Sequence, residues 1–252
     1  MADGIVLSAS GLVMEFKGFR AVDGVSLDIA RGSIHALIGP NGAGKSTCFN
    51  LLTKVLTPTA GTIRFEGRDI TGLSPANVAR LGIVRSFQIS AVFGSMTALE
   101  NVRLALQRRR HGDSWDFWRS DRVLAGLQEE ALELLSSVGL ADYAGHAAGD
   151  MPYGRKRALE IATTLALEPR VLLLDEPMAG MTQEDVTRIS ALIRKVAAGR
   201  TVVMVEHNLS VVADLSDRIT VLARGKILAE GVYADVSRDP RVVEAYIGVP
   251  HA

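Results

Sequence analysis

The hydrophobic residues of this chain fall into two kinds of pattern, short runs or alternations typical of strands and 3.6-residue periods typical of helices. Residues 22–30 alternate apolar and polar side chains, as a half-buried antiparallel strand does, and a turn at 17–20 separates them from an earlier apolar segment. Ser74 before Pro75 is a favourable helix N-cap. In the first third of the chain, strands are predicted at 5–16, 22–30, 34–38, 62–65 and 83–88, and helices at 45–54 and 75–81.

The pattern becomes helical between about 95 and 168, with Gly139 suited to cap the C-terminus of one helix. After residue 170, strands and helices alternate again. Helices are predicted at 97–107, 120–138, 183–197, 209–215 and 240–247, and strands at 171–175, 201–206, 219–223 and 226–229. We therefore expect a single domain across 1–252, with an α/β core and β subdomain formed by 1–94 and 166–252 and a helical subdomain at 95–165.

The residues after the predicted strand at 34–38 form a phosphate-binding motif. Residues 39–47 read Gly-Pro-Asn-Gly-Ala-Gly-Lys-Ser-Thr, which fits the phosphate-loop pattern G-x-x-x-x-G-K-[ST]. Its glycines allow positive φ and turn backbone N–H groups inward, and the following helix points its positive dipole end at the same place. Lys45 can reach the β- and γ-phosphates, and the Ser46 hydroxyl can ligate Mg²⁺. The alternative, a plain glycine-rich turn, does not explain the lysine and the hydroxyl.

Two acids end the apolar strand predicted at 171–175. The sequence there is Val-Leu-Leu-Leu-Asp-Glu-Pro, and Asp175 is typical of a carboxylate that orders Mg²⁺ beside a phosphate loop. Glu176 is then placed to activate an attacking water. A simple turn after the strand is the alternative for this segment.

Two further polar residues stand at strand ends. His207 follows the strand at 201–206, and a neighbouring position in a parallel sheet would let it donate a hydrogen bond to the γ-phosphate. Gln88 ends the strand at 83–88, and its amide can bind both metal and water. In isolation, His207 is more often a surface histidine and Gln88 a polar loop residue.

The composition of the chain restricts its ligands and its cellular location. The chain has 252 residues, and its 28 basic residues balance 28 acidic ones, so no basic excess points to nucleic acid as a ligand. The single cysteine, Cys48, forms no disulfide framework, which fits a reducing compartment. Cys48 either packs in the first turns of a helix or lies near the nucleotide. The N-terminus lacks the pattern of a signal peptide, and no apolar run approaches the ~18 residues that span a bilayer. We expect a cytosolic protein.

These motifs, with Tyr153-Gly154, occur in the order found in the ATP-binding subunit of ABC transporters, and the resemblance covers essentially the whole chain. It implies an α/β ABC-type P-loop NTPase with a RecA-like core, an antiparallel β subdomain and an inserted α-helical subdomain, which hydrolyses ATP. By this resemblance, the nucleotide-binding residues are Phe16, Asn41, Gly42, Gly44, Lys45, Ser46, Thr47 and Gly154, the magnesium-binding residues are Ser46, Gln88 and Asp175, and the catalytic residues are Glu176, His207 and Gln88. Phe16 resembles the aromatic residue that stacks on adenine, and Phe19 is its alternative.

The signature sequence departs from that family's usual Leu-Ser-Gly-Gly-Gln. Residues 151–155 read Met-Pro-Tyr-Gly-Arg, and Pro152 has neither a hydroxyl nor an N–H to offer a phosphate. Gly154 still offers its backbone, and we expect a helix from about 155 to 167. Basic residues at 155–157 add positive charge, and Thr182 replaces the usual D-loop aspartate. An altered contact with the nucleotide of a partner subunit is therefore expected.

Tyr153 in place of the first signature glycine resembles the ATP-binding subunits of branched-chain amino acid importers, as do residues 84–88, 157–162 and 244–248. This resemblance implies uptake of branched-chain or related amino acids. The implied partners are membrane-spanning permease subunits, a second ATPase subunit and, indirectly, a periplasmic solute-binding protein, at the cytoplasmic face of the membrane. The alternatives are a urea or amide importer, a lipopolysaccharide-type exporter, a soluble ABC ATPase without a transport role, or a regulatory module that does not hydrolyse ATP.

Overall fold

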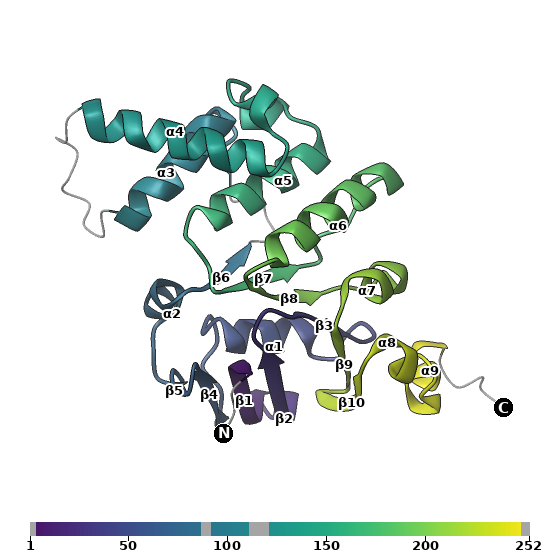
Figure 1. Ribbon diagram of the computed structural model, residues 1–252. Coiled ribbons are helices and arrows are strands. Elements are labelled where there is room, and N and C mark those ends of the chain that lie inside the picture. The colour runs from purple at the N-terminus through teal and green to yellow at the C-terminus, as the bar shows by residue number, and fades with distance from the viewer. Residues whose placement is uncertain (1–3, 87–91, 111–120, 248–252) are drawn as a thin grey trace. The chain divides into compact units, whose positions relative to one another are not determined.

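The computed structural model describes residues 4–86, 92–110 and 121–247 (Figure 1). Two compact units emerge from the contacts within the chain. The first, here called the sheet unit, comprises Met1–Arg85, Arg170–Pro177 and Arg194–Ala252. The second, the helical unit, comprises Ser86–Pro169 and Met178–Ile193. The division expected from sequence assigns 178–193 to the α/β core, whereas in the structure these residues group with the helical unit.

An antiparallel sheet forms one part of the sheet unit. Its strand order is β2-β1-β4-β5, with bounds β1 Ile5–Phe16, β2 Phe19–Ala30, β4 Ala60–Phe65 and β5 Arg68–Asp69. The turn between β1 and β2 is shorter than the predicted 17–20. Lys17 and Gly18 both have positive φ, 48° and 88°, as a two-residue type I′ hairpin requires. Phe19 therefore already belongs to β2.

A mostly parallel sheet forms the other part of the sheet unit. Its order is β10-β9-β3-β8-β7-β6. The bounds are β3 Ile34–Ile38, β6 Ile83–Ser86, β7 Val171–Asp175, β8 Thr201–Val205, β9 Arg218–Ala223 and β10 Lys226–Gly231. Every residue of β3, β7 and β8 is buried, as expected for strands covered on both faces. Because β8 lies parallel between β3 and β7, the carboxyl ends of these strands share one edge.

The helices of the sheet unit match most of the predicted ranges. They are α1 Lys45–Leu52, α2 Pro75–Leu81, α7 Leu209–Leu215, α8 Tyr233–Val236 and α9 Pro240–Ile247. Ser74 caps α2 by accepting a hydrogen bond from the Asn77 N–H at 3.4 Å, as predicted. α1 ends before the predicted residue 54 because Lys54 has a left-handed φ of 60°. α8 was not predicted from the sequence.

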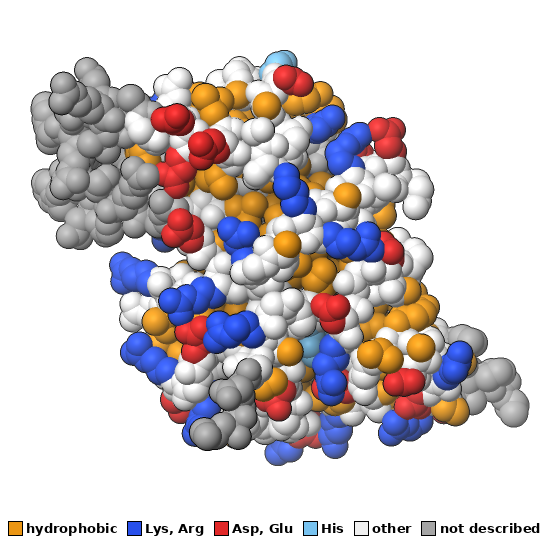
Figure 2. Space-filling view, in the orientation of Figure 1, with side chains coloured by type: hydrophobic (Ala, Val, Ile, Leu, Met, Phe, Trp, Pro, Cys, Tyr) orange, Lys and Arg blue, Asp and Glu red, His pale blue; other side chains and the backbone are white. Residues whose placement is uncertain are grey.

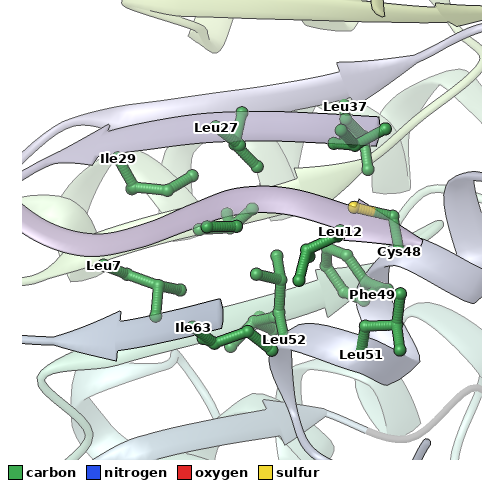
Figure 3. Packing of buried hydrophobic residues seen from close by; sticks show 14 of the residues in the cluster. Leu7, Leu12, Leu27, Ile29, Leu37, Cys48, Phe49, Leu51, Leu52 and Ile63 are labelled. Atoms are coloured by element: carbon green, nitrogen blue, oxygen red, sulfur yellow. The ribbon is translucent and has the colours of Figure 1, made fainter. Parts of the chain in front are cut away.

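The hydrophobic core of the sheet unit lies between α1 and the strands of both sheets (Figure 3). Phe49 of α1 is among its largest fully buried side chains. Around it the core gathers apolar side chains from several strands: Leu7, Leu12, Leu27, Ile29, Leu37 and Ile63. Cys48, Leu51 and Leu52 are also fully buried, so α1 is anchored by the face opposite its exposed Ser46. This anchoring holds the phosphate loop, which precedes α1, against the core.

The helical unit contains α3 Ala98–Arg110, α4 Asp121–Ser137 and α5 Tyr153–Leu165, and most of α6 Gln183–Ala197 groups with it. A capping box begins α3, since the Thr97 N–H donates to Glu100 Oε2 at 2.7 Å and the Glu100 N–H donates to Thr97 Oγ1 at 3.2 Å. Gly139, with φ 74°, follows the end of α4 as predicted. Across the described ranges, no helix is both long and apolar enough to cross a membrane.

Charged side chains of both signs are interspersed on the face shown in Figure 2. Lys and Arg stand beside Asp and Glu rather than in one separate field. This arrangement agrees with the equal numbers of basic and acidic residues in the sequence.

Candidate functional site

The phosphate loop connects β3 to α1 and has the backbone that its glycines predict. Gly39, Gly42 and Gly44 have φ of 149°, 77° and 98°. Two of them also lie against backbone that leaves no room for a side chain. A Cβ on Gly39 would lie 2.1 Å from the Leu222 carbonyl oxygen, and one on Gly44 would lie 2.4 Å from that of Ala21. The loop is therefore fixed in shape by close packing against β2 and β9.

Lys45 is the first residue of α1, and its ammonium group folds back over the loop. Its Nζ donates to the carbonyl oxygens of Gly39 and Pro40 at 2.7 and 3.0 Å. Burial lowers the pKa of Lys45, while the charges of Glu176 and Asp175 oppose that shift. These two acids are thus electrostatic neighbours of the lysine, although they follow it by about 130 residues in the sequence.

Asp175 and Glu176 stand at the carboxyl end of β7. Asp175 is almost completely buried, and its carboxylate is ion-paired with Arg85 of β6. Glu176 is half-buried and adopts a left-handed φ of 44°. Its N–H donates to the Val205 carbonyl at 2.9 Å, so the backbone turns out of the sheet while still tied to β8. Side chains held in this sparsely populated backbone region are frequent at functional sites.

His207 stands at the neighbouring strand end. Val205 of β8 is in register with both Leu37 of β3 and Asp175 of β7, so the segments that follow these strands leave the sheet at one level. The side chain of His207 is exposed there. Its backbone is held by Glu206, a fully buried acid whose Oε2 accepts from the N–H groups of His207 and Asn208 at 3.1 and 3.4 Å. Sequence reasoning missed this supporting role of Glu206.

The structure therefore gathers Lys45, Asp175, Glu176 and His207 at one edge of the parallel sheet, the usual place for ligands in such sheets. Ser46 and Asn41 are exposed beside them in the loop and first helical turn. Gln88, which the sequence adds to this group, lies outside the described residues.

The aromatic candidates for adenine stacking lie at the tip of the first hairpin. Phe16 ends β1 and pairs in register with Phe19, which begins β2. The two are 43% and 67% exposed, so both rings are free to stack. The hairpin approaches the phosphate loop through Ala21, whose carbonyl faces Gly44. The geometry thus keeps both rings as candidates.

The signature segment lies in the helical unit and begins a helix earlier than predicted. α5 starts at Tyr153 rather than near 155, with Pro152 as an N-cap that makes no side-chain capping bond. Gly154 is buried in the first turn because α6 approaches it closely: a Cβ at this position would lie 2.3 Å from Asp185 Oδ1. Asp185 in turn accepts a hydrogen bond from the Thr182 hydroxyl at 3.1 Å. Thr182, the departure from the usual D-loop residue, is therefore bonded to the side chain that touches Gly154.

The basic residues after Gly154 make contacts within the helical unit. The Arg155 guanidinium lies 5.1 Å from the centre of the Tyr143 ring and donates to the Gly139 carbonyl at 3.0 Å. Lys156 Nζ donates to the Gly149 carbonyl at 2.6 Å. Arg157 is buried and pairs with Glu160 at 2.5 Å. Arg155 and Lys156 thus tie the start of α5 to preceding segments of the helical unit, whereas Arg157 forms an ion pair within the helix itself.

Fold and site together define a phosphate-loop nucleoside triphosphatase, with its loop at the end of a central parallel strand and acids at the end of a nearby one. The family model for "ABC transporter" matches residues 22–179, and that for "Branched-chain amino acid ATP-binding cassette transporter" matches residues 226–252. The chain belongs to the ABC transporter family.

Similar proteins and a similar solved structure support this membership, and each covers nearly the whole chain. The high-affinity branched-chain amino acid transport ATP-binding protein BraF of Pseudomonas aeruginosa is 39% identical, with 96% of this chain and 98% of the relative covered. The corresponding protein LivG of Escherichia coli is 36% identical with the same coverage. A crystal structure of an ATP-binding cassette of an ABC transporter in its ADP conformation matches with a TM-score of 0.86 at 32% identity, covering 97% of this chain and 99% of that one. The expected family and fold class are confirmed.

Proposed function

We propose that this chain is the ATP-hydrolysing subunit of an ABC importer that takes up branched-chain amino acids. The ATPase activity follows from its family, and the observation that carries the substrate class is the full-length likeness to BraF and LivG. The C-terminal match to a branched-chain amino acid cassette model supports the same class. Urea and amides are the alternative substrates that the uptake experiment below distinguishes from branched-chain amino acids.

The residues at the sheet edge have chemistry that suits ATP with Mg²⁺. The loop residues Asn41, Gly42, Gly44 and Thr47 present backbone N–H groups to the phosphates, and Lys45 exchanges its present carbonyl partners for phosphate oxygens. The Ser46 hydroxyl and the Asp175 carboxylate are hard oxygen donors of the kind that Mg²⁺ prefers, and Gln88 would add an amide oxygen. Bound there, Mg²⁺ supplies positive charge that offsets the charge developing on the transferred phosphoryl group.

Glu176 serves in this proposal as the base that orients and deprotonates the attacking water. Its left-handed backbone aims the side chain out of the strand direction, and its N–H bond to Val205 fixes that turn. His207 donates a hydrogen bond to the γ-phosphate from the adjacent strand end. Phe16 stacks on the adenine ring. Gly154 of a second ATPase subunit caps the same nucleotide through its backbone.

The proposed partners follow from a nucleotide site that two ATPase subunits share and from a solute that crosses the membrane through other subunits. A second ATPase subunit, identical or related, completes each nucleotide site, and permease subunits carry the solute across the membrane. A periplasmic solute-binding protein delivers the solute to the permease, so it acts on this chain only indirectly. The chain would work at the cytoplasmic face of the membrane as a peripheral subunit. We propose no nucleic-acid partner, since the 28 basic and 28 acidic residues leave no net positive charge.

The test compares Lys45→Ala and Glu176→Gln with Glu184→Gln, which alters an exposed acid on α6. Lys45→Ala is expected to abolish ATP binding. Glu176→Gln is expected to bind MgATP as the parent does and to hydrolyse it roughly 10²–10⁴-fold more slowly, trapping an ATP-bound dimer. Glu184→Gln keeps both properties. Hydrolysis by Glu176→Gln at the parent rate would remove Glu176 from the role of base.

The substrate is tested by uptake of labelled leucine, isoleucine and valine in cells that lack the chromosomal copy of this chain. Restoration by the parent chain and not by Glu176→Gln supports the proposed importer. Restoration of urea or amide uptake, with branched-chain amino acid uptake unchanged, would overturn the substrate class while leaving the ATPase intact.

A further inference from the structure

Arg85 joins three elements around the carboxylate proposed to bind Mg²⁺. It lies on β6, with its side chain 15% exposed, next to β7 in the sheet. One end of its guanidinium, Nη2, donates to Asp175 Oδ2, and the other end, Nη1, donates to Asn50 Oδ1 of α1. The same guanidinium lies 5.7 Å from the centre of the Phe49 ring. All of these residues belong to the sheet unit.

A carboxylate as buried as Asp175, which is 1% exposed, requires a nearby positive charge or several hydrogen bonds. In this structure Arg85 supplies that charge. The bond to Asn50 and the contact with Phe49 hold the guanidinium in place, because both partners belong to the helix that starts at Lys45. Arg85 therefore ties the carboxyl end of β7 to the phosphate-loop helix.

We propose that Arg85 is the counter-ion of Asp175 when Mg²⁺ is absent, and that it sets how strongly nucleotide binding depends on Mg²⁺. The inference rests on the proposed function, in which Asp175 binds that ion. A guanidinium and a divalent cation on one carboxylate repel each other, so Arg85 weakens the hold of Asp175 on Mg²⁺. The same positive charge lets Mg²⁺-free ATP enter without facing an uncompensated carboxylate. Arg85 is thus a positioning residue that acts through Asp175.

The experiment measures equilibrium affinity for ATP in Mg²⁺ and in EDTA, together with the Mg²⁺ concentration for half-maximal ATP binding. Arg85→Met keeps an apolar stem beside Phe49 and removes the charge. It is expected to weaken binding of Mg²⁺-free ATP by about tenfold and to lower the half-maximal Mg²⁺ concentration by a similar factor. Arg85→Lys keeps the charge and is expected to retain most of the wild-type ratio between the two affinities.

Asn50→Ala provides a second test that does not leave Asp175 without a counter-charge, so it applies even if Arg85→Met does not fold. It removes only one anchor of the guanidinium, and it is expected to lower the half-maximal Mg²⁺ concentration severalfold below that of the wild-type chain. Equal changes of both affinities in Arg85→Met would overturn the proposal. If Arg85→Met does not fold, a half-maximal Mg²⁺ concentration in Asn50→Ala equal to that of the wild-type chain would overturn it. Failure of the wild-type chain to bind ATP at all would instead overturn the proposed function.

Discussion

Replacing Gly154 by alanine tests whether the close approach of α6 is what requires glycine at this position. Gly154 lies within the first turn of α5 and does not have a positive φ, so its backbone suits any L-residue. Alanine would even favour the helix, by about 0.5–1 kcal/mol relative to glycine. The opposing effect is a collision, because the new Cβ would lie 2.3 Å from Asp185 Oδ1 and 2.5 Å from its Cγ.

Asp185 can avoid the new Cβ by rotating away. The free-energy cost of the substitution is then the loss of the interactions that the Asp185 carboxylate makes. Its carboxylate accepts from the Thr182 hydroxyl at 3.1 Å and pairs with Arg188 at 2.7 Å. A side-chain bond at a helix start contributes about 1 kcal/mol, and a partly exposed ion pair about 0.5 kcal/mol. Gly154→Ala is therefore expected to be neutral or to destabilise the wild-type chain by up to about 1 kcal/mol, since the loss offsets or exceeds the helix-propensity gain.

A double-mutant cycle with Asp185→Ala isolates the contact. Asp185→Ala removes the three atoms that would lie nearest to the new Cβ. In that background Gly154→Ala is expected to stabilise the protein, so the two single changes should couple by about 1–2 kcal/mol in urea unfolding. An effect of Gly154→Ala that has the same sign and size in both backgrounds would refute this reasoning. Glycine would then be required there for a reason other than α6.

Two further predictions concern buried groups of the sheet unit. Burial lowers the pKa of His35 to about 4, with the Glu230 charge opposing and the Arg218 charge reinforcing the shift. Because the unfolded histidine binds a proton near pH 6.5, stability is full above that pH and falls by about 3 kcal/mol as the pH drops toward 4. Urea midpoints at pH 7.5 and 5 should differ less in His35→Gln than in the wild type, and an equal difference would contradict this assignment. Burial also raises the pKa of the Cys48 thiol to about 12, so iodoacetamide should label the protein only in urea, and rapid labelling of the native chain would show the thiol to be accessible.

The sequence predicts helices, strands and loops well where one short motif or one hydrophobic period determines the backbone conformation. The phosphate loop is recognisable because its glycines, lysine and hydroxyl occur at fixed spacing, and the structure gives those glycines the positive φ that the pattern requires. The strand at 34–38 and the helix at 183–197 are found with the predicted bounds, since apolar periodicity alone marks them. Sequence reasoning missed the bond between Thr182 and Asp185, although the Thr-x-x-Asp pattern that begins at Thr182 is the local signal that could have indicated it.

Contacts between distant segments were not predictable in this way. The ion pair of Arg85 with Asp175 depends on β6 and β7 being neighbours, and hydrophobic patterning does not give the order of strands in a sheet. The contact of Gly154 with Asp185 likewise depends on how α6 packs on the start of α5. The early end of α1 accompanies the left-handed backbone of Lys54, and glycine or asparagine, rather than lysine, usually signals that conformation after a helix.

The walls of the phosphate loop have a consequence for how the protein is made. The Leu222 carbonyl blocks a side chain at Gly39, and the Gly225 N–H donates to the Ala43 carbonyl at 3.0 Å. Ribosomes deliver the chain from its N-terminus, so the loop emerges long before these neighbours are translated. A nascent chain that stops short of β9 therefore carries the complete motif without the wall that shapes it. Such a chain is expected to bind nucleotide poorly, because the backbone that fixes the shape of the loop is missing.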